Sequence, residues 1–139
     1  MIGNLLEEKL CFESKGGKMI VQDTKVVKVG ENVSIGGKKR FTLIAGPCVM
    51  ESQELMLEVA GEINKICKKL GIEYIFKASF DKANRSSIHS YRGPGLEEGL
   101  KMLQKVKDTY GIPVVTDIHE PWQCEKVAEV ADLLQIPAF

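Results

Sequence analysis

The chain has 139 residues, of which 44% are hydrophobic and 27% charged, so it is long enough for one soluble globular domain with a moderate core. Nineteen basic residues balance nineteen acidic ones, which argues against nucleic acid or a membrane surface as a partner and requires any anion site to be built locally. No apolar run approaches the about 20 residues of a membrane span, and the N-terminus lacks the apolar core of a signal peptide. The four cysteines are far apart and form no C-x-x-C pair, which indicates reduced thiols, so we expect a cytoplasmic protein.

The N-terminal third of the chain begins with weakly patterned sequence. Residues 1–24 show little periodicity and are interpreted as a loose extension or a short helix. A small β-hairpin is predicted over residues 25–37, with its turn at Gly30–Asn32. The apolar run Phe41–Ala45 then stops at a Gly-Pro pair, which is typical of a buried parallel strand.

An amphipathic helix is predicted after this strand. Ser52 suits its N-cap, Glu54 is acidic in the first turn, Lys68 and Lys69 fall in the last turn, and Gly71 suits the stop. The apolar residues that recur at spacings of three and four are Met56, Val59, Ala60, Ile63, Ile66 and Leu70.

Further strands and helices alternate to the end of the chain. Strands are predicted at Tyr74–Ala78, Pro113–Thr116 and Leu133–Ile136. The helix between the first two is marked by Leu96, Leu100, Leu103 and Val106 and ends near Tyr110. A shorter third helix starts at Pro121 and has Trp122, Val127 and Val130 on its apolar face.

This β-α-β-α-β-α-β order predicts a parallel sheet with right-handed crossovers. A doubly wound sheet is the alternative, but no G-x-G-x-x-G loop follows any strand. Polar residues instead follow every strand, as they do at the carboxyl-terminal face of a (β/α)8 barrel. Because a complete barrel needs about 250 residues, residues 38–139 are predicted to be the N-terminal half of one.

A polar stretch after the second strand concentrates cations. Lys77, Lys82, Arg85 and Arg92 alternate with small hydroxyl and amide side chains before Gly93-Pro-Gly95. Lysine and arginine give charge-assisted hydrogen bonds to phosphate oxygens, so the stretch suits a phosphorylated small molecule. A solvated loop without a specific role is the alternative.

Five motifs occur in order along the chain: Ala45-Gly-Pro-Cys-Val-Met-Glu-Ser52, Lys77-Ala-Ser-Phe-Asp-Lys-Ala-Asn-Arg-Ser-Ser87, Tyr91-Arg-Gly-Pro-Gly-Leu-Glu97, Thr116-Asp-Ile-His-Glu120 and Gln135-Ile-Pro-Ala-Phe139. Together they resemble the 3-deoxy-D-manno-octulosonate 8-phosphate synthases. The resemblance covers residues 25–139, including the hairpin, which this family places across the closed end of its barrel.

The resemblance implies an enzyme that condenses phosphoenolpyruvate with arabinose 5-phosphate and water and releases phosphate, in lipopolysaccharide biosynthesis. The related 3-deoxy-arabino-heptulosonate 7-phosphate synthases use erythrose 4-phosphate and carry K-P-R-T where this chain has Lys82-Ala-Asn-Arg85, so the five-carbon sugar is favoured. That seven-carbon synthase and a catalytically inactive half-barrel are the alternatives. The 139 residues alone are expected to be inactive, and full-length relatives are expected to be homo-oligomers, usually tetramers.

The resemblance also implies roles for individual residues. Phosphoenolpyruvate would be bound by Lys77, Ser79, Lys82 and Gln135. Arabinose 5-phosphate would be bound by Asn84, Arg85 and Ser86. Lys82, between the two substrates, and Asp117, near a sugar hydroxyl, are the expected catalytic residues.

Cys48 is the one candidate metal ligand in the sequence. A lone cysteine after a strand is most often a small buried apolar residue. In the resembled family, however, a cysteine here marks enzymes that depend on a divalent metal, so zinc, iron or manganese is suspected. The remaining ligands would come from later strands absent from this chain, and His89 and His119 are rejected as substitutes. We assign no chemistry to Cys11, Cys67 or Cys124, which we interpret as packing residues or as part of the extension.

Overall fold

The structure, a computed structural model, describes residues 25–37, 41–83 and 89–137. The elements are β1 (Val27–Val29), β2 (Val33–Ile35), β3 (Thr42–Ala45), α1 (Gln53–Leu70), β4 (Glu73–Lys77), α2 (Leu96–Tyr110), β5 (Val114–Asp117), α3 (Gln123–Ala128) and β6 (Leu133–Gln135). From β3 onward strands and helices alternate, which confirms the predicted order. The predicted extension at residues 1–24 lies outside the described residues. None of the described helices is long and apolar enough to span a bilayer.

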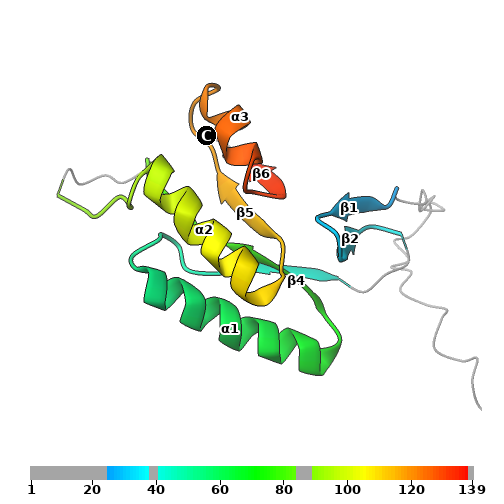
Figure 1. The fold of residues 1–139 in the computed structure, drawn as a ribbon. Coiled ribbons are helices and arrows are strands. Elements are labelled where there is room, and N and C mark those ends of the chain that lie inside the picture. Colours follow the sequence, from blue (N-terminus) through cyan, green and yellow to red (C-terminus); the bar gives the residue numbers. More distant parts are fainter. Residues whose placement is uncertain (1–24, 38–40, 84–88, 138–139) are drawn as a thin grey trace, which may run out of the picture.

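Strands β3, β4, β5 and β6 form one parallel sheet in that order (Figure 1). Lys77 of β4 lies opposite Val115 of β5, and Asp117 of β5 lies opposite Gln135 of β6. Because neighbouring strands run parallel, the carboxyl ends of all four meet at one edge of the sheet. The predicted α/β class with a parallel sheet is confirmed. That this sheet is half of a (β/α)8 barrel stays a prediction.

Alternate residues of the central strands face different layers of the molecule. On β4, Tyr74 and Phe76 belong to the main core, where the helices pack, whereas Ile75 packs beneath the hairpin. On β5, Val114 and Val115 divide in the same way. Since both faces are covered here, these strands appear in the sequence as continuous apolar runs.

Helix α1 begins and ends where the sequence predicts. The hydroxyl of Ser52 accepts a hydrogen bond of 3.1 Å from the backbone N–H of Leu55, and Ser52 itself is extended, with φ −149°. Gly71 ends the helix in the left-handed conformation, with φ +64°, which glycine adopts at little cost. Both caps are therefore encoded locally.

The buried side of α1 differs from the prediction near the carboxyl end of the helix. Met56, Ala60 and Cys67 are buried, and the interpretation of Cys67 as a packing residue is confirmed. Ile66 and Leu70, however, are each 54% exposed, so their assignment to the buried face was wrong. Successive helical residues are about 100° apart, so Ile66 points away from the core when Cys67 faces it.

Helices α2 and α3 cover the rest of the sheet. Leu103 and Val106 of α2 are fully buried, as predicted. In α3 Val127 is buried, but Trp122 is 67% exposed, so its placement on the apolar face was wrong. The inward position is taken by Gln123, whose side-chain oxygen accepts two backbone hydrogen bonds from the loop after β5.

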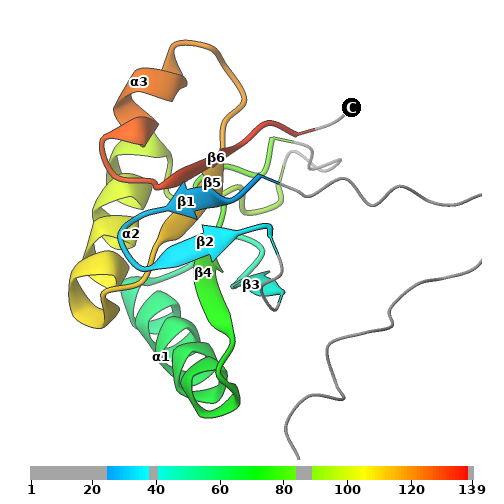
Figure 2. The same cartoon turned by 90° about the vertical axis from the view of Figure 1, so that its right-hand side faces the viewer.

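The predicted hairpin is present and lies on the face of the sheet opposite α1 and α2 (Figures 1 and 2). Val29 and Val33 pack against Ile75 and Val115 of the sheet, and the Ser34 N–H donates to the Glu73 carboxylate at the start of β4 (3.0 Å). The hairpin thus covers the sheet near the amino ends of its strands. Its role as the bottom of a barrel stays a prediction.

Candidate active site

The segment after β3 lies directly against the end of β4. A Cβ added to Gly46 would lie 1.9 Å from the backbone oxygen of Lys77, so only glycine permits this approach. Farther on, the Met50 N–H donates to the Ser79 carbonyl (3.0 Å), and Val49 and Ser79 form an isolated parallel bridge. These contacts bring Cys48 and its neighbours to the edge where the strands end.

Lys77 and Ser79 share one face of the extended chain at this edge. Ala78 and Phe80, which alternate with them, belong to the main core, so Lys77 and Ser79 point to the opposite face. Ser79 is fully buried, and its hydroxyl has no hydrogen-bond partner among the described residues. Buried polar atoms are nearly always paired, so an unpaired hydroxyl at this edge is unusual.

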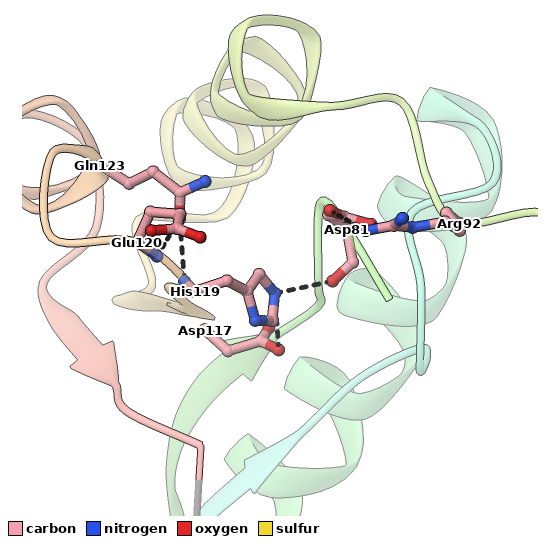
Figure 3. Close-up of polar contacts among 6 residues, drawn as sticks. All are labelled: Asp81, Arg92, Asp117, His119, Glu120 and Gln123. Carbon is pink, nitrogen blue, oxygen red and sulfur yellow. Dashed lines mark hydrogen bonds and ion pairs between the residues drawn. The ribbon is translucent and has the colours of Figure 1, made fainter. Parts of the chain in front are cut away.

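Asp117 and His119 extend the same face at the end of β5. Asp117 Oδ2 lies 3.5 Å from His119 Nε2, and both side chains are largely buried (Figure 3). Within the described part of the chain, Asp117 Oδ1 and His119 Nδ1 are buried without a hydrogen-bond partner. Continuing the β4–β5 register by two residues brings Ser79 level with Asp117. The carboxylate and the imidazole thus lie together, level with Ser79 on the neighbouring strand, and each of the three side chains has a buried atom without a partner among the described residues.

The position of His119 is fixed by contacts around it. Its Nε2 lies 2.9 Å from the backbone oxygen of Asp81, which makes Nε2 the protonated, donating nitrogen. Its ring meets that of Phe80 edge-on, at 6.1 Å between centroids, and its backbone N–H donates to Gln123 (2.8 Å). This placement of His119 beside Asp117 was not predicted. Strand alternation could not indicate it, because β5 ends at Asp117 and the chain bends at His119.

Arg92 pairs with a carboxylate in the structure. Its guanidinium makes two hydrogen bonds to the Asp81 carboxylate, of 2.8 Å and 2.7 Å (Figure 3). The hydrogen bonds to the Asp81 carboxylate, and the negative charge of that carboxylate, raise the pKa of Arg92. In the structure Arg92 is thus paired with Asp81, and its predicted part in binding a phosphorylated ligand stays a prediction.

The lysines of the candidate site lie near one another along the chain. Lys77 and Lys82 are both partly buried, and no hydrogen bond or ion pair of either ammonium group is found within residues 25–37, 41–83 and 89–137. Gln135 is exposed on β6, opposite Asp117. Asn84, Arg85 and Ser86 lie outside the described residues. The structure thus brings Lys77, Ser79, Lys82, Asp117 and Gln135 to one edge of the sheet.

A hollow of about 490 Å³ lies beside this edge. The described residues that line it are Val49, Glu51, Ser90 and Tyr91. The Tyr91 hydroxyl donates to the Met50 carbonyl (3.0 Å), which joins the segment before α2 to the loop after β3. The wall of the hollow is therefore held by a hydrogen bond between two loops.

A family model described as the DAHP synthetase I family matches residues 19–139. The chain belongs to this family. Several curated relatives are named 2-dehydro-3-deoxyphosphooctonate aldolase, another name for the synthase that the five motifs resemble. The protein from Fusobacterium nucleatum is 73% identical over 121 residues, covering 87% of this chain and 43% of the relative. The protein from Chromobacterium violaceum is 61% identical over 113 residues, covering 81% of this chain and 40% of the relative.

The resemblance found in the motifs is thus confirmed by relatives that carry the same name. A third relative of that name, from Pseudomonas entomophila, is 56% identical over 115 residues, covering 83% of this chain and 41% of its own length. The chain therefore spans about two-fifths of the length of the curated relatives it matches.

In this member of the DAHP synthetase I family, Cys48 was the predicted metal ligand. Cys48 is exposed on the loop after β3, so its thiol is accessible, and the alternative of a small buried residue is wrong. No group of three or more His, Cys, Asp or Glu side chains suited to a metal ion occurs within the described ranges. The described residues therefore do not form a complete metal site, and the ligand role of Cys48 stays a prediction.

Proposed function

We propose that this chain is part of a 3-deoxy-D-manno-octulosonate 8-phosphate synthase. The enzyme condenses phosphoenolpyruvate with D-arabinose 5-phosphate and water, and it gives 3-deoxy-D-manno-octulosonate 8-phosphate and phosphate for lipopolysaccharide biosynthesis. The observation that carries this proposal is the 73% identity over 121 residues to a protein named 2-dehydro-3-deoxyphosphooctonate aldolase. The convergence of Lys77, Ser79 and Asp117 at one edge of the sheet supports it.

The proposed scaffold is a (β/α)8 barrel of which this chain supplies the first four strands. Four parallel strands in sequential order, with helices on one face, support this architecture. In a barrel the face beneath the hairpin becomes the interior, and the carboxyl-terminal edge becomes the mouth. Lys77, Ser79 and Asp117 would then surround the mouth, where (β/α)8 enzymes hold their substrates.

Binding of two phosphorylated substrates requires fixed positive charge, because their phosphates repel each other in a site shielded from water. We assign phosphoenolpyruvate to Lys77, Ser79, Lys82 and Gln135. We assign the sugar phosphate to Asn84, Arg85 and Ser86, since the planar guanidinium of arginine binds two phosphate oxygens at once. The partly buried lysines support the first assignment, because their ammonium groups have no ionic partner in the described part of the chain.

In the proposed reaction, C3 of phosphoenolpyruvate attacks the aldehyde carbon of arabinose 5-phosphate while water adds at C2. The resulting hemiketal phosphate loses phosphate by cleavage of its C–O bond. Lys82 lies between the two substrates and donates a hydrogen bond to the aldehyde oxygen as negative charge develops there. Asp117 accepts a hydrogen bond from a sugar hydroxyl through its unpaired Oδ1.

Cys48 is proposed as one ligand of a divalent metal, zinc, iron or manganese. A bound metal of this kind supplies a Lewis acid that polarises an oxygen of the substrate. The exposure of Cys48 at the edge that carries Lys77 supports this assignment. The other ligands would come from residues beyond those described. The assembled enzyme is proposed to be a cytoplasmic homo-oligomer, as are the tetrameric synthases that its motifs resemble.

The test is release of inorganic phosphate from phosphoenolpyruvate by the protein expressed from its complete gene. Phosphate release that depends on arabinose 5-phosphate is expected. The second candidate, the seven-carbon synthase, is favoured by the description of the matched family, and it predicts dependence on erythrose 4-phosphate instead. Binding of phosphoenolpyruvate without turnover on either sugar would indicate a non-catalytic module and would contradict the proposal. The isolated 139 residues are expected to show no turnover.

A further inference from the structure

Asp81, four residues after the end of β4, is held from two sides. Its carboxylate accepts the paired hydrogen bonds from Arg92, at 2.8 Å and 2.7 Å. Its backbone oxygen lies 2.9 Å from Nε2 of His119, which follows β5 (Figure 3). Asp81 therefore joins the segment after β4 both to the segment before α2 and to the end of β5.

Backbone hydrogen bonds also join the segment after β4 to the segment before α2. The Lys82 N–H donates to the Arg92 carbonyl (2.6 Å), and the Gly95 N–H donates to the Phe80 carbonyl (3.1 Å). Gly93 has φ +127°, and a Cβ at this residue would lie 2.2 Å from the backbone oxygen of Phe80. Only glycine permits so close an approach. The backbone of Lys82 is thus fixed next to Arg92.

We propose that Asp81 and Arg92 are positioning residues that aim the ammonium group of Lys82 into the active site. We call the two contacts of Asp81, to Arg92 and to His119, the Asp81 clasp. The inference rests on the proposed function, because it assigns a purpose to the placement of Lys82. It goes beyond that function by giving roles to two side chains that do not touch the substrates.

The exposure of the Asp81–Arg92 ion pair indicates that the pair orients the two segments and does little to stabilise the fold. The Arg92 side chain is 55% exposed and that of Asp81 29%, and ion pairs so open to water add little to folding stability. A two-pronged pair nevertheless fixes the relative direction of its partners. A lysine in place of Arg92 would keep the charge but could make only one of the two bonds, so the clasp requires arginine.

The test is a double-mutant cycle on the affinity for phosphoenolpyruvate, measured by titration calorimetry with the protein from the complete gene. Arg92→Ala is expected to weaken binding about tenfold when Lys82 is present and less than about twofold in a Lys82→Ala background. Arg92→Lys is expected to recover less than half of the loss, and it keeps the test decisive if the alanine variant folds poorly. An equal loss of affinity in the two backgrounds would overturn the proposal, because an effect of Arg92→Ala that does not act through Lys82 is the same whether or not Lys82 is present.

A matched control is Lys101→Ala, which breaks an exposed ion pair with Glu98 on α2. This variant is expected to leave the affinity for phosphoenolpyruvate within about twofold of the parent. A larger loss would mean that any surface ion pair affects binding, and it would contradict the special role of Arg92.

Hydrogen exchange at the Lys82 amide separates failure of the clasp from failure of the proposed function. This amide is expected to be protected in the parent and to exchange faster in Arg92→Ala, with or without substrate. If the parent does not bind phosphoenolpyruvate, the proposed function fails, and faster exchange in the variant still supports the clasp. Unchanged exchange in the variant would overturn the clasp whatever the protein binds.

Discussion

The carboxylate of Asp117 lies 3.5 Å from Nε2 of His119, yet its other oxygen is buried with no hydrogen-bond partner among the described residues. An unpaired oxygen on a buried carboxylate is unfavourable in the absence of ligand. Removing the charge of Asp117 should therefore favour folding and weaken substrate binding.

Asp117→Asn is expected to leave the free energy of unfolding unchanged or to raise it by up to about 1 kcal/mol, because a buried charge is removed. The KM for arabinose 5-phosphate is expected to rise about tenfold or more, because a hydrogen bond to a charged acceptor is weakened. Denaturant unfolding without substrate and steady-state kinetics check the two parts. A clear loss of stability with unchanged KM would contradict both.

Asp132→Asn is the matched comparison and is expected to behave in the opposite way. The carboxylate of Asp132 accepts hydrogen bonds from Lys107 (2.9 Å) and from the Val114 N–H (3.0 Å), at the amino ends of β5 and β6. Loss of the charge is expected to lower the free energy of unfolding by about 1–2 kcal/mol. The KM values for both substrates should stay within error of the parent. A raised KM would contradict the assignment of substrate binding to the carboxyl edge of the sheet alone.

Lys82→Ala and Arg85→Ala are each expected to lower kcat/KM by about a hundredfold or more, since each removes a cation from the site proposed to bind two anions. Phosphate-release assays over a range of both substrates measure the effect. For Lys82 the loss should appear in kcat as well as KM. Near-full turnover by the Lys82 variant would refute the role assigned to this residue. Lys101→Ala is the control, and it should have parental kinetics.

Stability at alkaline pH should depend on two buried groups. Burial raises the pKa of the Cys67 thiol above its ordinary value of 9.0. Burial, with a smaller contribution from Cys67, raises the pKa of Tyr74 above its ordinary value of 10.0. The folded state therefore keeps these protons longer than the unfolded state, so the contribution of these two groups to the free energy of unfolding is constant below about pH 9 and falls as pH rises further.

Two substitutions check this alkaline loss. Cys67→Ala and Tyr74→Phe should each make the fall in unfolding free energy between pH 9 and pH 11 shallower, because a titrating group is removed. Tyr74→Phe should also cost about 1 kcal/mol at neutral pH, since the hydroxyl donates to the Ala45 carbonyl (3.1 Å). An unchanged slope in both variants would mean that other groups control alkaline unfolding.

Thiol labelling should separate Cys48 from Cys67. Cys48 is exposed and Cys67 buried, so native iodoacetamide labelling followed by mass spectrometry should modify Cys48 at least about tenfold faster. In the protein from the complete gene, zinc should slow labelling of Cys48 and leave Cys67 unaffected, because a metal-bound thiolate is protected. Labelling of Cys48 that zinc does not slow would contradict its role as a ligand.

Much of the fold could be predicted because its signals are local. Ser52 and Gly71 mark the ends of α1, and the apolar runs before Gly46 and Lys77 mark β3 and β4. Helical periodicity was less reliable at helix ends. Ile66 fits the apolar spacing as well as Cys67 does, and only packing against α2 and the sheet decides which of them is buried.

The candidate site was predicted only where strand direction determines it. Asp117 is the last residue of the buried strand β5, so its place at the carboxyl edge is a consequence of parallel pairing. The pairing of Asp81 with Arg92 could not be found in this way, because they are eleven residues apart across a loop whose path no periodicity describes. A basic residue in a polar stretch gives no sign of whether it will bind a ligand or a nearby carboxylate.

One face of β4 changes character along its length. Ile75 is sealed beneath the hairpin, whereas Lys77 and Ser79, on the same side farther on, reach the edge where the strands end. Under the proposed assignment of Asp117 to the sugar, variation at Asp117 would alter the choice of acceptor sugar, while Ile75 and Val115 would keep the scaffold intact. Libraries that randomise only the carboxyl-terminal positions of this face should yield folded proteins with new preferences for the acceptor sugar. The reason is that packing beneath the hairpin and the proposed substrate binding involve separate stretches of the same strands.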